Sequence, residues 1–161
     1  MRKIFWFVVL DLLLFAAAAS AQTVSPIIAE GGKGKAKGGF TVTNNGVVPM
    51  VVTVQAMTFH LMPEGKAIYL PLESDVAVKL TETSAKIGAR QNHVFAYEVQ
   101  CLSQQPCLIA FLPRMVTGLH TTEGIQLGLI IPHSVYLCPS QEKAKGCRTR
   151  VRIAAGIPEG R

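Results

Sequence analysis

The stretch "GGFTVTNNGVVPMVVTVQAMTF", residues 38–59, decides the fold class. Apolar and polar side chains alternate over residues 40–43, which is the period of a strand with one buried face. The turn residues Asn-Asn-Gly follow at 44–46, and alternation resumes over residues 50–59. The stretch therefore predicts two β-strands joined by a turn.

The chain that follows this pair consists of short β-branched runs separated by turn residues, without the period of a long amphipathic helix. The segments that we expect to carry further strands are "HLMPEGKAIYLPL" (60–72), "DVAVKL" (75–80), "TSAKIGARQNHVFAYEVQC" (83–101), "CLIAFLPRM" (107–115, with the strand ending at Pro113) and "EGIQLGLIIPHSVYLCP" (123–139). About seven short strands with regular turns are typical of an immunoglobulin-like sandwich. The sequence therefore predicts an all-β, immunoglobulin-like β-sandwich.

The first residues have the features of a secretory signal peptide. A basic start, "MRK", precedes the apolar run "IFWFVVLDLLLFAAAA", and small residues lie before Gln22. We expect cleavage after Ala21, which makes residues 1–21 the signal peptide; an uncleaved membrane anchor is the alternative. Residues 22–139 then form the predicted domain, and residues 140–161 form a basic C-terminal tail or an extra strand.

All four cysteines, Cys101, Cys107, Cys138 and Cys147, follow the predicted signal peptide. An even number of cysteines in an exported protein predicts disulfides. Local pairing of 101 with 107 and of 138 with 147 closes two short loops, each stabilising the fold by roughly 2–3 kcal/mol; the two other pairings remain open. Zinc is the competing use, but the separations do not match the short spacings of structural zinc sites. We therefore expect no metal site.

The formal net charge is +6, and removal of the signal peptide, which holds two cations and one anion, leaves +5. The excess lies in "KGKAK" (33–37) and "KAKGCRTRVR" (143–152). Basic clusters of this kind suit nucleic acid, a membrane surface or an acidic partner. Because these clusters lack interleaved aromatic residues, we expect no nucleic-acid partner. Solvated loops and a polar tail are the simpler interpretation.

In combination, the segments resemble the N-terminal domain of the periplasmic pilus-assembly chaperones, the PapD-like family. The order that carries the resemblance is "GGFTVTNNGVVPMVVTVQAMTF", "EGKAIYLPL", "KIGARQNHVFAYEV", "CLIAFLPR" and "EGIQLGLIIPHSVYLCP", over residues 23–139. The last segment ends in "VYLCP", where the family has an aromatic-x-x-proline pattern. The resemblance implies an immunoglobulin-like domain in the periplasm that serves pilus or fimbria assembly.

The resemblance also implies a role for the last strand. In such chaperones this strand is donated to a pilus subunit whose own sandwich lacks a strand: alternate bulky side chains fill the subunit's groove while the backbone pairs with its edge. Ile125, Leu127 and Leu129 match the donor motif position by position, Ile131 continues the same face, and the opposite face is expected to pack on the chaperone. The implied partner is an exported pilus or fimbrial subunit, with an outer-membrane assembly platform as a further candidate. An inward face of an ordinary terminal strand is the alternative.

Two departures from the family pattern weaken the implied activity. Family members anchor the subunit's terminal carboxylate with an Arg in the first strand and a Lys in the donor strand, and these positions fall here at Ile28 and Ser134. Lysines from the run 33–37 are the alternative anchors. The family also has a second sandwich after the donor strand, whereas residues 140–161 offer one more strand at most.

Other function classes find little support in the sequence. The four histidines, His60, His93, His120 and His133, are scattered, and each is expected to be satisfied or exposed rather than a metal ligand. The chain has no nucleophile elbow, phosphate loop or dinucleotide fingerprint. We therefore expect no enzyme, no cofactor and no small-molecule substrate. The alternatives to a chaperone-like protein are a PapD-like structural or scaffold module in the cell envelope and a pilus-like subunit.

Overall fold

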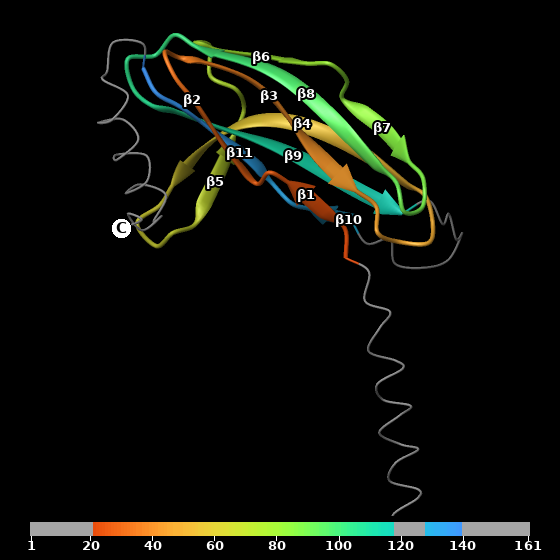
Figure 1. Ribbon diagram of the computed structural model, residues 1–161. Helices are drawn as coiled ribbons and strands as arrows, with labels where there is room; N and C mark the ends of the chain where they lie inside the picture. Colours follow the sequence, from red (N-terminus) through yellow and green to blue (C-terminus); the bar gives the residue numbers. More distant parts are fainter. Residues whose placement is uncertain (1–20, 118–127, 140–161) are drawn as a thin grey trace, which may run out of the picture.

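The computed structural model describes residues 21–117 and 128–139, which form two β-sheets packed face to face (Figure 1). One sheet has the order β1-β3-β8-β6 (Thr23–Ser25, Lys35–Thr43, Asn92–Cys101, Val76–Leu80). The other has the order β2-β11-β9-β4-β5 (Ile28–Gly31, His133–Leu137, Cys107–Thr117, Met50–Leu61, Ala67–Leu70), with β10 (Gly128–Ile130) pairing β9 and β7 (Ser84–Ile87) pairing β4.

The predicted all-β, immunoglobulin-like sandwich is confirmed. The described residues form only strands, turns and loops, and none of them belongs to a helix long and apolar enough to cross a membrane. The predicted signal peptide and the C-terminal tail fall, except for Ala21, outside the described residues. The described residues form eleven strands where about seven were expected, because short strands also form before residue 35 and the last predicted strand is interrupted.

The turns lie where the sequence places them. After β3 the fully buried Asn44 donates from its amide to the carbonyls of Val48 (2.8 Å) and Gly88 (2.9 Å), and its side-chain oxygen accepts from the backbone N of Gly46 (3.0 Å). Between β4 and β5, Gly65 has a φ of 78°, a conformation that strongly favours glycine. Local turn chemistry therefore sets the ends of these strands.

The main core lies between the sheets and is rich in aromatic side chains. The Phe40 ring lies 5.5 Å from that of Phe95 and 5.9 Å from that of Phe111, and Tyr97 stacks on Phe111 at 4.6 Å between ring centroids. These residues occupy alternate positions on β3, β8 and β9, so the period-two pattern of the sequence is what brings them together.

The prediction that the strand over residues 107–115 ends at Pro113 is wrong, since β9 continues to Thr117. The N–H of Val54, the β4 partner of Pro113, donates to Thr83 at 2.8 Å and so points away from β9. The backbone N of Pro113, which carries no hydrogen, therefore points away from β4. It faces the side on which β9 changes partner from β11 to β10. A proline is tolerated at such a break because no ladder hydrogen bond is lost.

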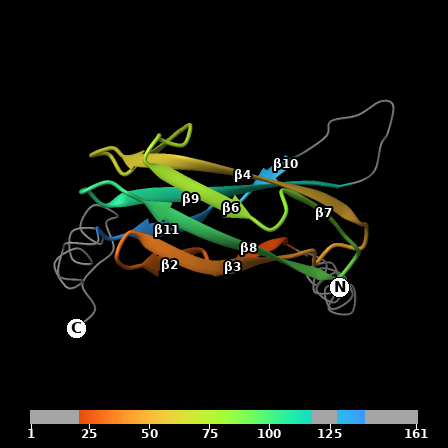
Figure 2. The ribbon, with the colours of Figure 1, turned by 90° about the horizontal axis from the view of Figure 1, so that it is seen from above.

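The last predicted strand, residues 123–139, is not continuous. Its described part forms β10 and β11, separated at Ile131 and Pro132, and residues 123–127 lie outside the described residues. β10 lies farther than β11 toward the β7 end of the molecule (Figure 2). Because of this break, β10 and β11 lie in different surroundings.

Candidate functional site

The candidate site is the unpaired edge of β10. This strand pairs only with β9, so its other edge has no partner among the described residues. β11, by contrast, lies between β9 and β2 and has both edges occupied. Only the β10 half of the last strand therefore offers backbone groups to an added strand in residues 128–139.

The side chain of Leu129 faces the core side of the sheet and is nevertheless exposed. Leu129 is the Cα partner of Met115, which in turn pairs with Val52, and directly opposed residues point to the same face. Met115 is 3% exposed and Val52 is 0% exposed, whereas Leu129 is 44% exposed. An inward-facing apolar side chain at an open edge is suited to fill the groove of a neighbouring sandwich.

The four predicted donor residues have different outcomes. Ile125 and Leu127 lie outside the described residues. Ile131 is partly buried against the main core, so it serves this protein's own packing. On the opposite face, Ile130 is 51% exposed beside Arg114, which differs from the expectation that this face packs on the protein itself.

The two expected anchor positions are neighbours in the structure, but neither is basic. Ile28 of β2 is the Cα partner of Ser134 of β11, and the backbone N of Ser134 donates to the carbonyl of Ile27 at 2.8 Å. Ile28 is 43% exposed, so an apolar side chain and a hydroxyl stand where the family pattern has two cations. This pair provides no positive charge for a carboxylate.

Of the lysines that are alternative anchors, Lys35 and Lys37 lie on the other sheet, and Lys33 lies in the turn between β2 and β3. Lys35 and Lys37 begin β3, and with Lys79 they border a hollow of about 470 Å³ on the outer face of that sheet. Lys37 forms an ion pair with Glu98 at 2.6 Å, and this hydrogen bond raises the pKa of Lys37 and lowers that of Glu98. Such an exposed ion pair contributes little to stability.

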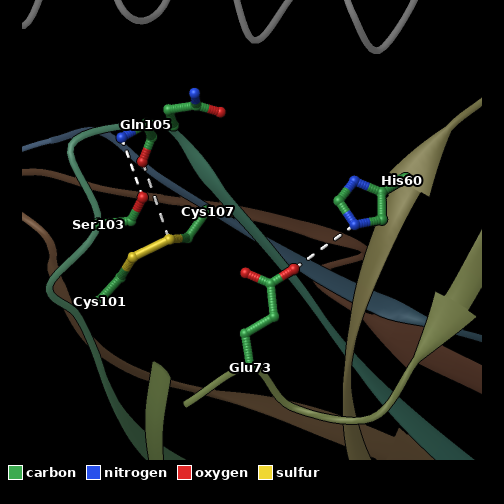
Figure 3. The surroundings of a disulfide bond; sticks show 6 residues. All are labelled: His60, Glu73, Cys101, Ser103, Gln105 and Cys107. Atoms are coloured by element: carbon green, nitrogen blue, oxygen red, sulfur yellow. Dashed lines mark hydrogen bonds and ion pairs between the residues drawn. A yellow bond between two sulfur atoms is a disulfide. The ribbon is translucent and has the colours of Figure 1, made fainter. Parts of the chain in front are cut away.

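The predicted disulfide between Cys101 and Cys107 is present and joins the end of β8 to the start of β9 (Figure 3). Cys138 is also disulfide-bonded, and its predicted partner Cys147 lies outside the described residues. Asp75, Cys101 and Cys107 lie close enough to hold a metal ion, but both sulfur atoms are committed to the disulfide. They are therefore not thiolate ligands.

Each histidine that the structure describes has a partner. His60 lies 3.5 Å from Glu73 (Figure 3), and His93 contacts Glu82. His133 is fully buried and bonded to Pro26 and Tyr97, a core role that its sequence context did not reveal. His120 lies outside the described residues.

No family model matches the sequence, and no curated protein matches it. Many solved structures match the fold. A crystal structure of the class 5 fimbriae chaperone CfaA matches with a TM-score of 0.58 and 11% identity, over 76% of this chain and 58% of that chain. A complex of the SafA pilin with the SafB chaperone from Salmonella enterica gives 0.56 and 11%, over 80% and 59%.

A third match is the CsuC–CsuE chaperone–tip subunit pre-assembly complex of Acinetobacter baumannii, with a TM-score of 0.53 and 12% identity, over 84% of this chain and 62% of that chain. This chain therefore spans less than two thirds of the length of each of these three solved chains. At these identities the likeness shows the fold. The predicted resemblance to a PapD-like N-terminal domain is confirmed at that level.

Proposed function

We propose that this protein is a chaperone-like component of pilus or fimbria assembly in the periplasm, which binds incomplete β-sandwich subunits by strand addition at β10. The observation that carries the proposal is the open edge of β10 with Leu129 facing inward and 44% exposed. An added strand gains main-chain hydrogen bonds from the edge, and the groove of its sandwich gains an apolar side chain.

The comparisons support this choice of partner by analogy. Solved structures with a similar fold include a chaperone in complex with a pilin and a chaperone in complex with a tip adhesion subunit. We therefore restrict the proposed partner to an exported subunit and include no outer-membrane platform. No enzymatic step and no cofactor is part of the proposal.

The experiment is a pull-down from the periplasm of the native host with intact protein and with variants of confirmed fold. The variants are Leu129→Asp and the triple change Ile125→Asp, Leu127→Asp, Leu129→Asp. The matched control is Val94→Asp, which places the same charge at a 56% exposed apolar position on the other sheet. We expect the intact protein and the control to recover an exported β-rich subunit and the edge variants to lose it. Equal recovery by all proteins would contradict strand addition.

A scaffold module is the second candidate, and the opposite end of the larger sheet favours it. The edge strand β5 and the residue pair after it form an apolar edge surface with Ile68 and Leu70 on one face of the strand and Tyr69 on the other, together with Leu72. Each of these side chains is 36–41% exposed. If a partner is recovered equally by the Leu129 variant but lost with Ile68→Asp, this surface rather than β10 is the binding site.

A further inference from the structure

Arg114 is an exposed cation on the strand that pairs with β10. It is the Cα partner of Ile130, and it points to the outer face of the sheet because the next residue, Met115, points into the core. Among the residues that the structure describes, Arg114 forms no ion pair. Its guanidinium is therefore available to an anion from another chain.

The Arg114 side chain lies against Gly128 of β10. A Cβ atom at position 128 would be 3.4 Å from the Nε of Arg114 and 4.0 Å from its Cγ. The arginine side chain therefore extends diagonally from β9 across the outer face of β10, whose far edge is unpaired in the described part of the chain. A strand added at that edge meets the guanidinium beside Gly128.

Among the residues that the structure describes, the strand partners around Arg114 on this face are neutral. Thr53 of β4 is its Cα partner on one side and Ile130 is its partner on the other, while Val116 is opposite Gly128. None of these side chains competes for the guanidinium as an acid would. Arginine presents a planar fork of donors that fits a carboxylate with two parallel hydrogen bonds.

We propose that Arg114 binds a carboxylate on the strand that adds to β10 and so fixes the register of that strand. The inference rests on the proposed function and adds the chemistry of the partner: an extended apolar strand with a carboxylate that reaches the outer face beside Gly128. The neutral pair Ile28 and Ser134 offers no charge for this purpose. The carboxylate can belong to an acidic side chain or to the C-terminus of the added strand.

The test measures binding of short synthetic peptides that alternate valine and threonine. One peptide has glutamate in place of a central threonine and an amidated C-terminus, a second has glutamine and a free C-terminus, and a third has glutamine and an amide. We expect the intact protein to prefer one carboxylate peptide over the neutral peptide by about fivefold at low salt, the range of an exposed ion pair. The preferred peptide identifies the source of the carboxylate.

Variants separate this inference from the proposed function. Arg114→Gln is expected to bind all three peptides equally, while Lys79→Gln, an exposed lysine change on the other sheet, keeps the preference. Gly128→Leu keeps the arginine but fills its space, so the preference is also expected to fall. Leu129→Asp is expected to lose every peptide. A preference that survives in Arg114→Gln overturns the inference and leaves strand addition intact. Equal binding of all three peptides by the intact protein also overturns the inference about Arg114 and leaves strand addition intact. If the intact protein binds none of the peptides, both the inference and the proposed strand addition are overturned.

Discussion

A fully buried histidine connects the two sheets near the point where the N-terminal strand changes sheet. His133 of β11 stacks on Phe40 with ring centroids 5.0 Å apart, and its Nδ1 lies 2.7 Å from the carbonyl oxygen of Pro26. Its Nε2 lies 3.0 Å from the hydroxyl of Tyr97. Because a carbonyl only accepts, Nδ1 must carry the proton, and in the neutral ring Nε2 accepts from Tyr97.

We expect His133→Phe to destabilise the protein at neutral pH by about 1–3 kcal/mol. Phenylalanine keeps the ring in the aromatic core, but it leaves the buried hydroxyl of Tyr97 and the carbonyl of Pro26 without their partner. Chemical denaturation of both proteins measures the difference. Tyr97→Phe combined with His133→Phe is the control, since removing both polar partners is expected to recover part of the loss.

The same pair of proteins tests a pH dependence. Burial lowers the pKa of His133 below the ordinary value of 6.5, although the bond to Pro26 opposes the shift. Between the lowered pKa and 6.5 the unfolded chain binds more protons than the folded one, so stability falls as the pH falls through this window. The stability gap between the native protein and His133→Phe is therefore expected to narrow below pH 6.5. A gap that widens on acidification would contradict a neutral buried ring.

At the scale of the element, the last strand shows what sequence periodicity can and cannot predict. Alternation identified the strand, because one face of a half-buried strand must be apolar. It did not predict which face lies toward the core: Leu129 is on the core side, whereas the opposite face was expected to pack on the protein. Periodicity did not predict the break at residues 131–132 or the passage of β9 through Pro113, since both depend on which strand lies opposite. The sequence analysis likewise did not single out Arg114. Its contact with Gly128 depends on the pairing of β9 with β10, which periodicity does not show.

The open edge of β10 leads to a prediction about self-association. Backbone N–H groups point alternately to the two sides of a strand, and the Val54–Thr83 hydrogen bond fixes this alternation on β4. Through the pairing of β4 with β9 and of β9 with β10, the N–H of Leu129 points toward β9 and that of Ile130 points toward the open edge. Proline at position 130 removes an edge donor without removing a ladder bond, so Ile130→Pro is expected to fold normally.

Sedimentation velocity over a range of concentrations checks this prediction. An open apolar edge promotes association of identical chains, so the intact protein is expected to form dimers or larger species. Ile130→Pro and Leu129→Asp are expected to remain monomeric under the same conditions. An intact protein that stays monomeric at all concentrations would remove most of the support for β10 as a binding edge.

At the scale of the whole molecule, the fold class followed from the sequence more surely than the site. Alternating runs and turn residues such as Asn44 and Gly65 act on neighbouring residues of the chain, so the sequence alone predicts the strands and turns that they form. The meeting of Ile28 and Ser134 across a parallel pair requires the N-terminal strand to leave one sheet and join the other. Counting along the family pattern placed these two positions, but only the topology shows that they are opposite each other.

The disulfide between Cys101 and Cys107 connects the two sheets through β8 and β9, and it gives the last prediction. It closes a short loop with a sequence separation of 6, for which the chain-entropy relation gives about 2 kcal/mol. The double change Cys101→Ala, Cys107→Ala is expected to lower the free energy of unfolding by that amount and to leave the fold unchanged. The double variant is preferable to reduction of the intact protein, because a reductant also attacks the disulfide of Cys138. Denaturation of the double variant with and without reductant then isolates that second contribution, and an unchanged midpoint and slope in the double variant would show that the loop is already restricted in the unfolded chain.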